Sequence, residues 1–170
     1  MTPLKRIYLI GFMGSGKSTA GKNLATLLNW EFTDLDEMVE KFAGATIPEI
    51  FQKEGEDYFR KMESEMLDRL KSVENVVIAT GGGTPCFRDN MAFMLKTGLT
   101  IYLKMTPEQL FDRLTGSTES RPLVKNLDSD RLRVFIEGKL KMREEWYGMS
   151  EIIVDGMDLD VNTLRSFIKT

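Results

Sequence analysis

The chain has 170 residues and a net charge of −3, with 42% hydrophobic and 29% charged residues. This composition is globular, lacks the cationic excess of a nucleic-acid-binding surface, and contains no apolar run long enough to span a membrane. The absence of histidine excludes histidine-dependent catalysis and histidine-bound zinc, and the single cysteine, Cys86, excludes an internal disulfide. We therefore expect one soluble, cytoplasmic domain over residues 1–170 that binds neither nucleic acid nor membrane.

Short apolar runs alternate with longer helical patterns along the chain. The predicted strands are Arg6–Ile10, Trp30–Thr33, Val76–Thr80, Leu99–Lys104 and Ile152–Val154. The predicted helices are Lys17–Leu28, Asp36–Phe42, Ile47–Lys53, Glu56–Leu70, Arg88–Lys96, Pro107–Leu114, Asp130–Tyr147 and Val161–Ile168. Strand–helix alternation predicts an α/β fold with a parallel sheet.

A polar segment, residues 115–128, lies between two predicted helices. It contains Gly116, Arg121 and Pro122. A connection this long inside a compact domain is usually functional or mobile. We weigh a lid that carries Arg121 equally against a plain surface loop.

A phosphate-binding motif follows the first predicted strand. Residues 11–18 read GFMGSGKS and match G-x-x-x-x-G-K-[ST] between a strand and a helix. Glycines let successive N–H groups face an anion, and the helix N-terminus adds its positive end. Lys17 reaches the β- and γ-phosphates and the Ser18 hydroxyl can ligate Mg²⁺. The motif therefore predicts nucleotide binding.

Two aspartates, Asp34 and Asp36, follow the second predicted strand. Alternate positions of an extended segment share a face, and open α/β sheets bind ligands at the carboxyl ends of their strands. One carboxylate could orient Mg²⁺ while the other accepts a proton from a hydroxyl. Capping of the next helix is the alternative, and local sequence alone favours it.

Further polar candidates follow along the chain. The glycine triplet Gly81–Gly83 comes after the third predicted strand and permits close approach of a ligand. Arg60 either serves a site or forms a weak surface ion pair with Glu63. Arg143 falls within the apolar stripe of the last long helix, where it either extends to solvent or reaches a buried anion.

Together these residues resemble the shikimate kinases, which share the fold of nucleoside monophosphate kinases. The resemblance covers nearly the whole chain and rests on GFMGSGKST at 11–19, DLD at 34–36, FR at 59–60, GGG at 81–83, RPL at 121–123, and Arg143 with Tyr147. It implies a three-layer α/β/α P-loop kinase fold, a five-stranded parallel sheet of order 2-3-1-4-5, and a lid at about residues 115–128. It also implies transfer of the ATP γ-phosphoryl group to the 3-hydroxyl of shikimate, with Mg²⁺, by a monomer.

The resemblance also implies residue roles. Lys17, Asp36 and Arg121 would be catalytic, with Asp36 as the base, while Ser18 and Asp34 would organise the metal. The residues implied in nucleotide binding are Gly14, Ser15, Gly16, Lys17, Ser18, Thr19, Arg113 and Arg121. Those implied in shikimate binding are Asp36, Phe51, Phe59, Arg60, Gly81, Gly82, Gly83 and Arg143.

One segment departs from the family pattern. Residues 155–162 read DGMDLDVN and lack the arginine or proline that the family often places against adenine. Two alternatives stay open: another small-metabolite kinase of this fold, such as a gluconate or nucleoside monophosphate kinase, and a nucleotide-binding protein without a phosphoryl acceptor. Cys86 has no assigned role.

Overall fold

The structure is a computed structural model that describes residues 4–116, 124 and 126–168. The strands are β1 (Arg6–Ile10), β2 (Glu31–Asp34), β3 (Val76–Ala79), β4 (Leu99–Lys104) and β5 (Ile152–Asp155). The helices are α1 (Lys17–Leu28), α2 (Leu35–Ala43), α3 (Ile47–Glu54), α4 (Glu56–Arg69), α5 (Asn90–Thr97), α6 (Pro107–Gly116), α7 (Ser129–Tyr147) and α8 (Val161–Ser166), with short 3₁₀ turns η1 (Leu70–Ser72) and η2 (Thr84–Cys86).

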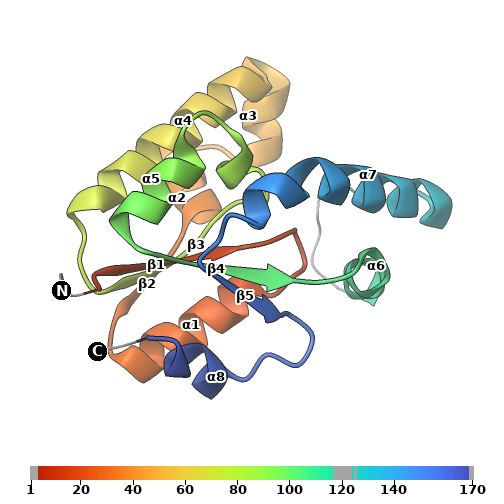
Figure 1. The fold of residues 1–170 in the computed structure, drawn as a ribbon. Helices are drawn as coiled ribbons and strands as arrows, with labels where there is room; N and C mark the ends of the chain where they lie inside the picture. The colour runs from red at the N-terminus through yellow and green to blue at the C-terminus, as the bar shows by residue number, and fades with distance from the viewer. Residues whose placement is uncertain (1–3, 117–123, 125, 169–170) are drawn as a thin grey trace.

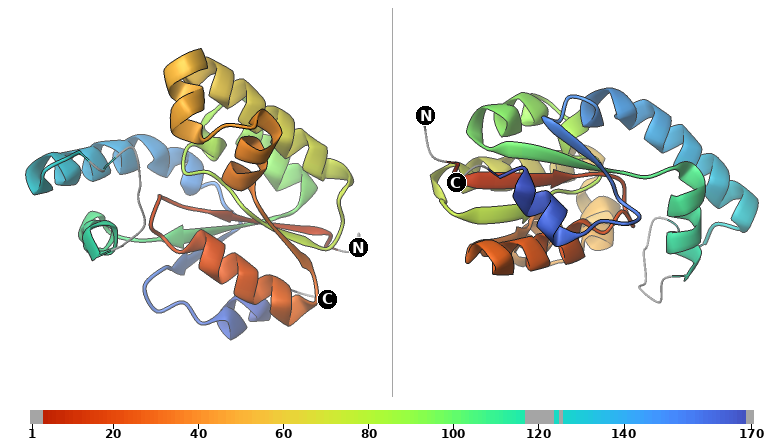
Figure 2. Two further views of the ribbon diagram at one scale, coloured as in Figure 1. Left: turned by 180° about the vertical axis from the view of Figure 1, so that it is seen from behind. Right: turned by 60° about the horizontal axis from the view of Figure 1, so that its bottom comes forward.

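The strands form one parallel sheet in the order β2-β3-β1-β4-β5, which confirms the predicted fold class and strand order. Helices α1 and α8 cover one face, and α2, α3, α4, α5 and α7 cover the other (Figures 1 and 2). The carboxyl ends of all strands therefore point to the same edge, where α1, α2 and η2 begin.

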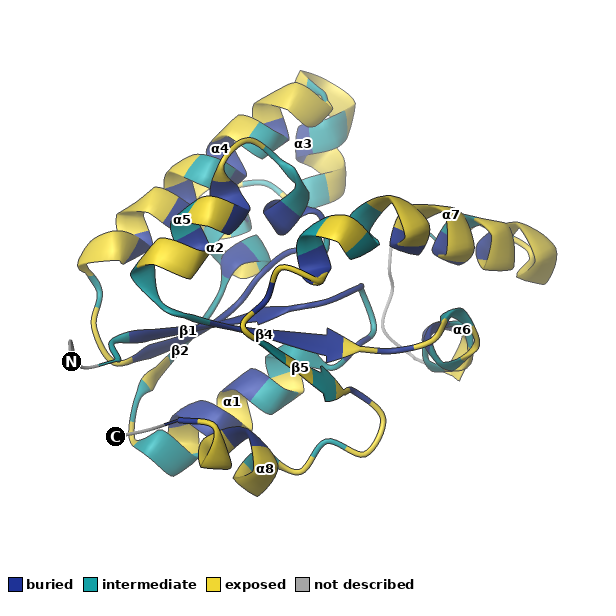
Figure 3. Ribbon diagram, viewed as in Figure 1, coloured by how far each residue is buried: buried dark blue, intermediate teal, exposed yellow. Residues whose placement is uncertain are grey.

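Successive side chains of the central strands pack alternately into two separate hydrophobic cores, one on each face of the sheet. Ile7 and Leu9 of β1 pack with Leu24 of α1, whereas Tyr8 and Ile10 pack on the opposite face with the larger group of helices. This alternation follows from the two-residue period of a strand. Because both faces are covered, every residue of β1 and β3 is buried, while the edge strands β2 and β5 are partly exposed (Figure 3).

Helix boundaries follow local capping. A capping box begins α3, since the Thr46 amide donates to Glu49 Oε2 at 2.7 Å and the Glu49 amide donates to Thr46 Oγ1 at 3.4 Å. The helix predicted from Arg88 begins instead at Asn90, because Arg88 adopts a φ of +48°, which no right-handed helix contains. Among the described residues, no helix has the length and apolarity to cross a bilayer.

Candidate active site

The phosphate loop, residues 11–18, links β1 to α1 and is shaped by its glycines. Gly14 and Gly16 have φ values of +82° and +89°, which residues with a β-carbon rarely adopt. Gly16 is the N-cap of α1 and offers no capping side chain. The first N–H groups of α1 are thus left facing a ligand site rather than a side-chain acceptor.

Lys17, the first residue of α1, folds back over this loop. Its Nζ donates to the carbonyl oxygens of Gly11 at 2.8 Å and Phe12 at 2.9 Å. These bonds hold the ammonium group at the mouth of the loop, where a terminal phosphate of a nucleotide would sit. Ser15, in the same loop, is buried with 1% exposure.

Asp34 caps α2, the alternative considered from the sequence, and also contacts the phosphate loop. Its Oδ1 caps α2 by accepting from the amides of Asp36 at 3.0 Å and Glu37 at 3.4 Å. Its Oδ2 accepts from the Ser18 hydroxyl at 2.6 Å. A hydroxyl and a carboxylate are therefore joined at the edge of the phosphate loop, and oxygen ligands of this kind suit Mg²⁺.

Asp36 lies on the first turn of α2, beside the phosphate loop. Burial and the neighbouring carboxylates of Glu63 and Asp34 raise the pKa of Asp36 to about 7, against the opposing effects of Lys17 and Arg60. The carboxyl group therefore changes charge near neutral pH. A group with this pKa is suited to exchange a proton with a substrate hydroxyl.

Arg60 is not on the surface, and its ion pair with Glu63 is not a weak surface contact. Glu63 is fully buried and accepts from Arg60 Nη1 at 2.9 Å and from the Thr84 hydroxyl at 2.7 Å. The Arg60 guanidinium stacks at 4.3 Å from the ring centroid of Phe87 and 5.1 Å from that of Phe59. Arg60 is thereby fixed at one wall of the site.

Arg143 on α7 reaches inward rather than to solvent. Its Nη1 is buried and has no hydrogen-bond partner among the described residues. The guanidinium carbon lies 5.4 Å from the ring centroid of Phe12. A buried charged donor without an acceptor is unfavourable, and an anion bound beside it would satisfy it.

The glycine triplet brings these side chains together. A β-carbon at Gly81 would lie 2.8 Å from Asp36 Oδ1, one at Gly82 would lie 3.0 Å from Arg143 Nη1, and one at Gly83 would lie 2.5 Å from Arg60 Nη2. The three positions are glycine because functional side chains occupy the space, not because φ is positive. We call Asp36, Arg60, Arg143 and Gly81–Gly83 the acceptor cradle.

An aromatic pair and a tyrosine complete the cradle. Phe51 and Phe59 pack with ring centroids 4.8 Å apart, next to Arg60. The Tyr147 hydroxyl donates to the Gly82 carbonyl oxygen. Tyr147 is one of the residues on which the resemblance to the family rests. Its hydrogen bond to Gly82 holds the glycine triplet in place.

A cavity of about 410 Å³ adjoins the other end of the phosphate loop. Its lining includes Ser15, Gly16, Thr19 and Arg113, together with Gly156 and following residues of the atypical 155–162 segment. Arg113 donates to the carbonyl oxygens of Gly14 at 3.4 Å and Gly156 at 3.1 Å, so it ties α6 to both sides of the cavity. The cavity is placed to receive the nucleoside part of a bound nucleotide.

The structure also bears on Arg121, on Cys86 and on two site residues that the sequence analysis did not single out. Arg121 and most of the predicted lid lie outside the described residues. Cys86 is half-buried, and burial raises the pKa of its thiol to about 11, so the reactive thiolate is scarce. Glu63 and Thr84 were missed as site residues, although Glu63 stands three positions after Arg60, the spacing of side chains that share a helix face.

Comparisons with known proteins agree with this geometry. The shikimate kinase family matches residues 13–168. A shikimate kinase of Parabacteroides distasonis is 42% identical over 89% of this chain and 88% of its own length. The crystal structure of a shikimate kinase from Bacteroides thetaiotaomicron superposes with a TM-score of 0.94 at 38% identity, covering 98% of this chain and 99% of that one.

Two further solved structures share the fold. A shikimate kinase from Acinetobacter baumannii, solved in complex with shikimate, superposes with a TM-score of 0.85 at 36% identity, covering 97% of this chain and 90% of that one. A gluconokinase from Sinorhizobium meliloti, at 18% identity and a TM-score of 0.60 over 96% of this chain and 89% of that one, shares the fold alone. The chain therefore belongs to the shikimate kinase family.

Proposed function

We propose that this chain transfers the γ-phosphoryl group of ATP to the 3-hydroxyl of shikimate, giving shikimate 3-phosphate and ADP. The observation that carries the proposal is the acceptor cradle, in which Arg60 and Arg143 approach the glycine triplet from two helices beside Asp36. Two guanidinium groups suit an acceptor that bears a carboxylate, because arginine binds carboxylates through paired, directional hydrogen bonds.

The cradle divides the acceptor into a charged end and a reacting end. Arg60 and Arg143 bind the carboxylate, and Phe51 and Phe59 line the ring. Gly81, Gly82 and Gly83 contact the ring through backbone groups. Asp36 faces the hydroxyl groups and takes the proton that the 3-hydroxyl loses when its oxygen bonds to phosphorus.

The phosphate loop holds the donor. The N–H groups of Gly14, Ser15, Gly16, Ser18 and Thr19 surround the phosphates, and Lys17 neutralises charge on the transferring group. Arg113 lies against adenine in the cavity of about 410 Å³. Arg121, carried by a lid at about residues 115–128, contacts the transferring phosphate when the lid excludes water.

Ser18 and Asp34 fit Mg²⁺. Their oxygen atoms lie 2.6 Å apart at the edge of the phosphate loop, and the described part of the chain holds no larger cluster of acidic or cysteine ligands. One hydroxyl and one carboxylate suffice, because Mg²⁺ in kinases keeps water and phosphate oxygens as its remaining ligands. When bound, Mg²⁺ supplies neutralisation of phosphate charge.

A coupled ADP-release assay tests the proposal. Purified protein with MgATP is offered shikimate, gluconate or a nucleoside monophosphate at equal concentrations. We expect ADP release with shikimate, and release at the background rate with the other two. Equal or faster turnover with gluconate or a nucleotide assigns the acceptor cradle to another metabolite, and ATP binding without turnover on any acceptor supports a non-catalytic nucleotide-binding protein.

The quaternary state belongs to the same proposal. We propose that residues 1–170 act as a monomer in the cytoplasm, because the phosphate loop and the acceptor cradle are both formed by one chain. Light scattering of the eluted protein checks the mass, and a dimer at assay concentration would contradict the expectation.

A further inference from the structure

Arg60 has two carboxylate partners of different kinds. Its Nη1 bonds to Glu63 at 2.9 Å, and Glu63 is fully buried. Its Nε and Nη2 both reach a single oxygen, Glu56 Oε1, at 3.4 Å, and the side chain of Glu56 is 56% exposed. The first contact is short and shielded from water, while the second is long, shared and open to solvent, so it is the weaker of the two.

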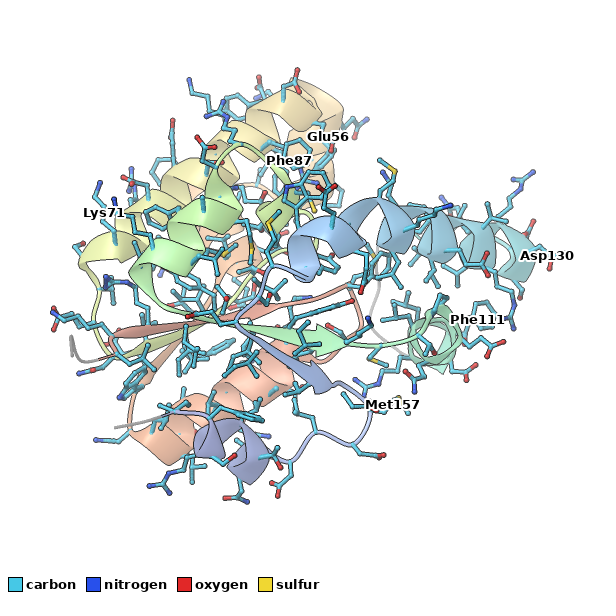
Figure 4. The ribbon with its side chains drawn as sticks, viewed as in Figure 1. Glu56, Lys71, Phe87, Phe111, Asp130 and Met157 are labelled. Atoms are coloured by element: carbon cyan, nitrogen blue, oxygen red, sulfur yellow. The ribbon has the colours of Figure 1, made fainter. Side chains whose placement is uncertain are left out.

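The edge held by Glu56 is one that an incoming carboxylate can use. A carboxylate that binds arginine through two parallel hydrogen bonds needs two adjacent N–H groups, and Nε and Nη2 form such a pair. The guanidinium cannot turn freely to offer another edge, because Phe87 stacks on it at 4.3 Å and Glu63 fixes Nη1. Glu56 and Phe87 are both labelled in Figure 4, at the end of the molecule where α3 and α4 meet.

Arg143 differs from Arg60 in this respect. Its Nη1 has no acceptor among the described residues, so a ligand carboxylate adds a hydrogen bond there and removes none. At Arg60 a ligand carboxylate that takes the Nε–Nη2 edge replaces one that is already present. The two arginines of the cradle thus make unequal contributions to binding.

We propose that Glu56 is a specificity-determining residue that competes with the acceptor's carboxylate for the Nε–Nη2 edge of Arg60. Glu56 holds this edge when no acceptor is bound, and on binding its side chain turns to solvent while the acceptor's carboxylate takes its place. Glu63 stays bonded throughout. The proposal rests on the proposed function, since it concerns the same acceptor and the same arginine.

Competition of this kind lowers affinity for the charged acceptor and leaves a neutral analogue unaffected. An acceptor without a carboxylate does not displace Glu56, so it keeps the ion pair intact. Removal of Glu56 should therefore strengthen binding of shikimate and change binding of its methyl ester less. Loss of a merely structural contact would weaken binding of both.

Three variants test the proposal by calorimetric titration with shikimate and its methyl ester. Glu56→Gln removes the negative charge. Glu56→Asp keeps the charge but shortens the side chain by one methylene, which moves the carboxylate away from Arg60. Asp57→Asn removes a charge from the same first turn of α4, at an exposed residue that forms no ion pair among the described residues. It therefore controls for the overall field and for the helix dipole.

We expect Glu56→Gln to lower the Kd for shikimate about two- to fivefold, the range of a partly exposed ion pair. Glu56→Asp should shift the Kd in the same direction. Asp57→Asn should change the Kd by less than about 1.5-fold because of screening. A raised Kd in Glu56→Gln, equal shifts in Asp57→Asn, or wild-type affinity in Glu56→Asp overturns the proposal. Failure of wild-type protein and Asp57→Asn to bind shikimate at all would instead refute the proposed function.

Discussion

The phosphate loop and the acceptor cradle lie at the same edge of the sheet but are built differently. The phosphate loop is contiguous in sequence, and its ligand groups are mostly N–H groups directed by glycines at positive φ. The acceptor cradle collects side chains from α2, α4 and α7 around a glycine triplet after β3. The first therefore depends on backbone conformation, and the second depends on how distant helices pack.

This difference separates the expected effects of substitution. A change in the phosphate loop alters a preformed cage and should act on the chemical step. A change at Arg60 or Arg143 of the acceptor cradle removes a contact to the acceptor's carboxylate and should act mainly on acceptor binding, whereas a change at Asp36 also removes the proton acceptor. The predictions below test this division, beginning with the largest expected effect.

Lys17→Met should reduce turnover by about 10²- to 10³-fold, the usual loss when one preorganised electrostatic group is removed. The fold should survive, since the hydrogen bonds of Lys17 Nζ to the Gly11 and Phe12 carbonyl oxygens, at 2.8 and 2.9 Å, lie within the phosphate loop. Steady-state assays and circular dichroism measure the two effects. Lys22→Met, at an exposed position of the same helix, is the control, and near-normal turnover of a folded Lys17→Met protein would contradict the assignment of the loop.

Asp36→Asn and Asp34→Asn should differ in their response to Mg²⁺. Asp36→Asn keeps the shape of the site and removes the proton acceptor, so turnover should fall by about 10²-fold or more at any Mg²⁺ concentration. Asp34→Asn weakens the pair with Ser18, so its turnover should recover partly as Mg²⁺ rises. Titration of both variants at saturating shikimate makes the comparison. Rescue of Asp36→Asn by metal would reverse the two roles.

Arg143→Ala should raise the Kd for shikimate about 10- to 100-fold, because a hydrogen bond between charged groups contributes about 1.5–3 kcal/mol. Arg60→Ala should also weaken shikimate binding, and it should lower the melting temperature more, since it leaves the fully buried Glu63 without its cationic partner. Neither should change the Kd for ATP. Titrations with each ligand and thermal melts test this, and loss of ATP affinity with intact shikimate affinity would refute the carboxylate assignment.

Asp36→Asn should stabilise the protein against unfolding in alkaline but not in acidic buffer. The pKa of Asp36 is raised from 3.8 to about 7 in the folded state, mainly by burial. Stability from this raised pKa is present below pH 4 and is lost as pH rises to about 7. The Asp36→Asn variant has no carboxyl group to ionise, so it does not lose this stability. Its free energy of unfolding should exceed that of wild type by roughly 2–4 kcal/mol at pH 8.

The measurement is thermal unfolding from pH 4 to 8 in EDTA, with Glu37→Gln, at an exposed neighbour on α2, as the control. The difference between Asp36→Asn and wild type should grow over this range, and the difference for the control should stay constant. A constant difference for Asp36→Asn would show that the carboxyl group has an ordinary pKa.

The phosphate loop could be predicted from its local residues, whereas the members of the acceptor cradle could be grouped only through the family resemblance. The motif at residues 11–18 sits within one strand–turn–helix unit, so its geometry follows from local residues. Arg143 and Gly82 are 61 positions apart, and only packing of α7 against η2 brings them together. The ion pair between Arg60 and Glu63 was correctly considered from the sequence, but it is buried and not at the surface. The spacing of residues on a helix does not reveal which face of the helix is covered.

The strand order has a consequence for the making of the protein. The strand that leads into the phosphate loop lies between β3 and β4, so Ile7 aligns with Val77 on one side and with Leu99 on the other. Parallel neighbours this distant in sequence pair slowly, because long loops must close first. The ribosome therefore synthesises the whole nucleotide motif early, and β3 and β4, which pair with β1, much later. During synthesis β1, which leads into the nucleotide motif, lacks one of its two neighbouring strands until β4 emerges.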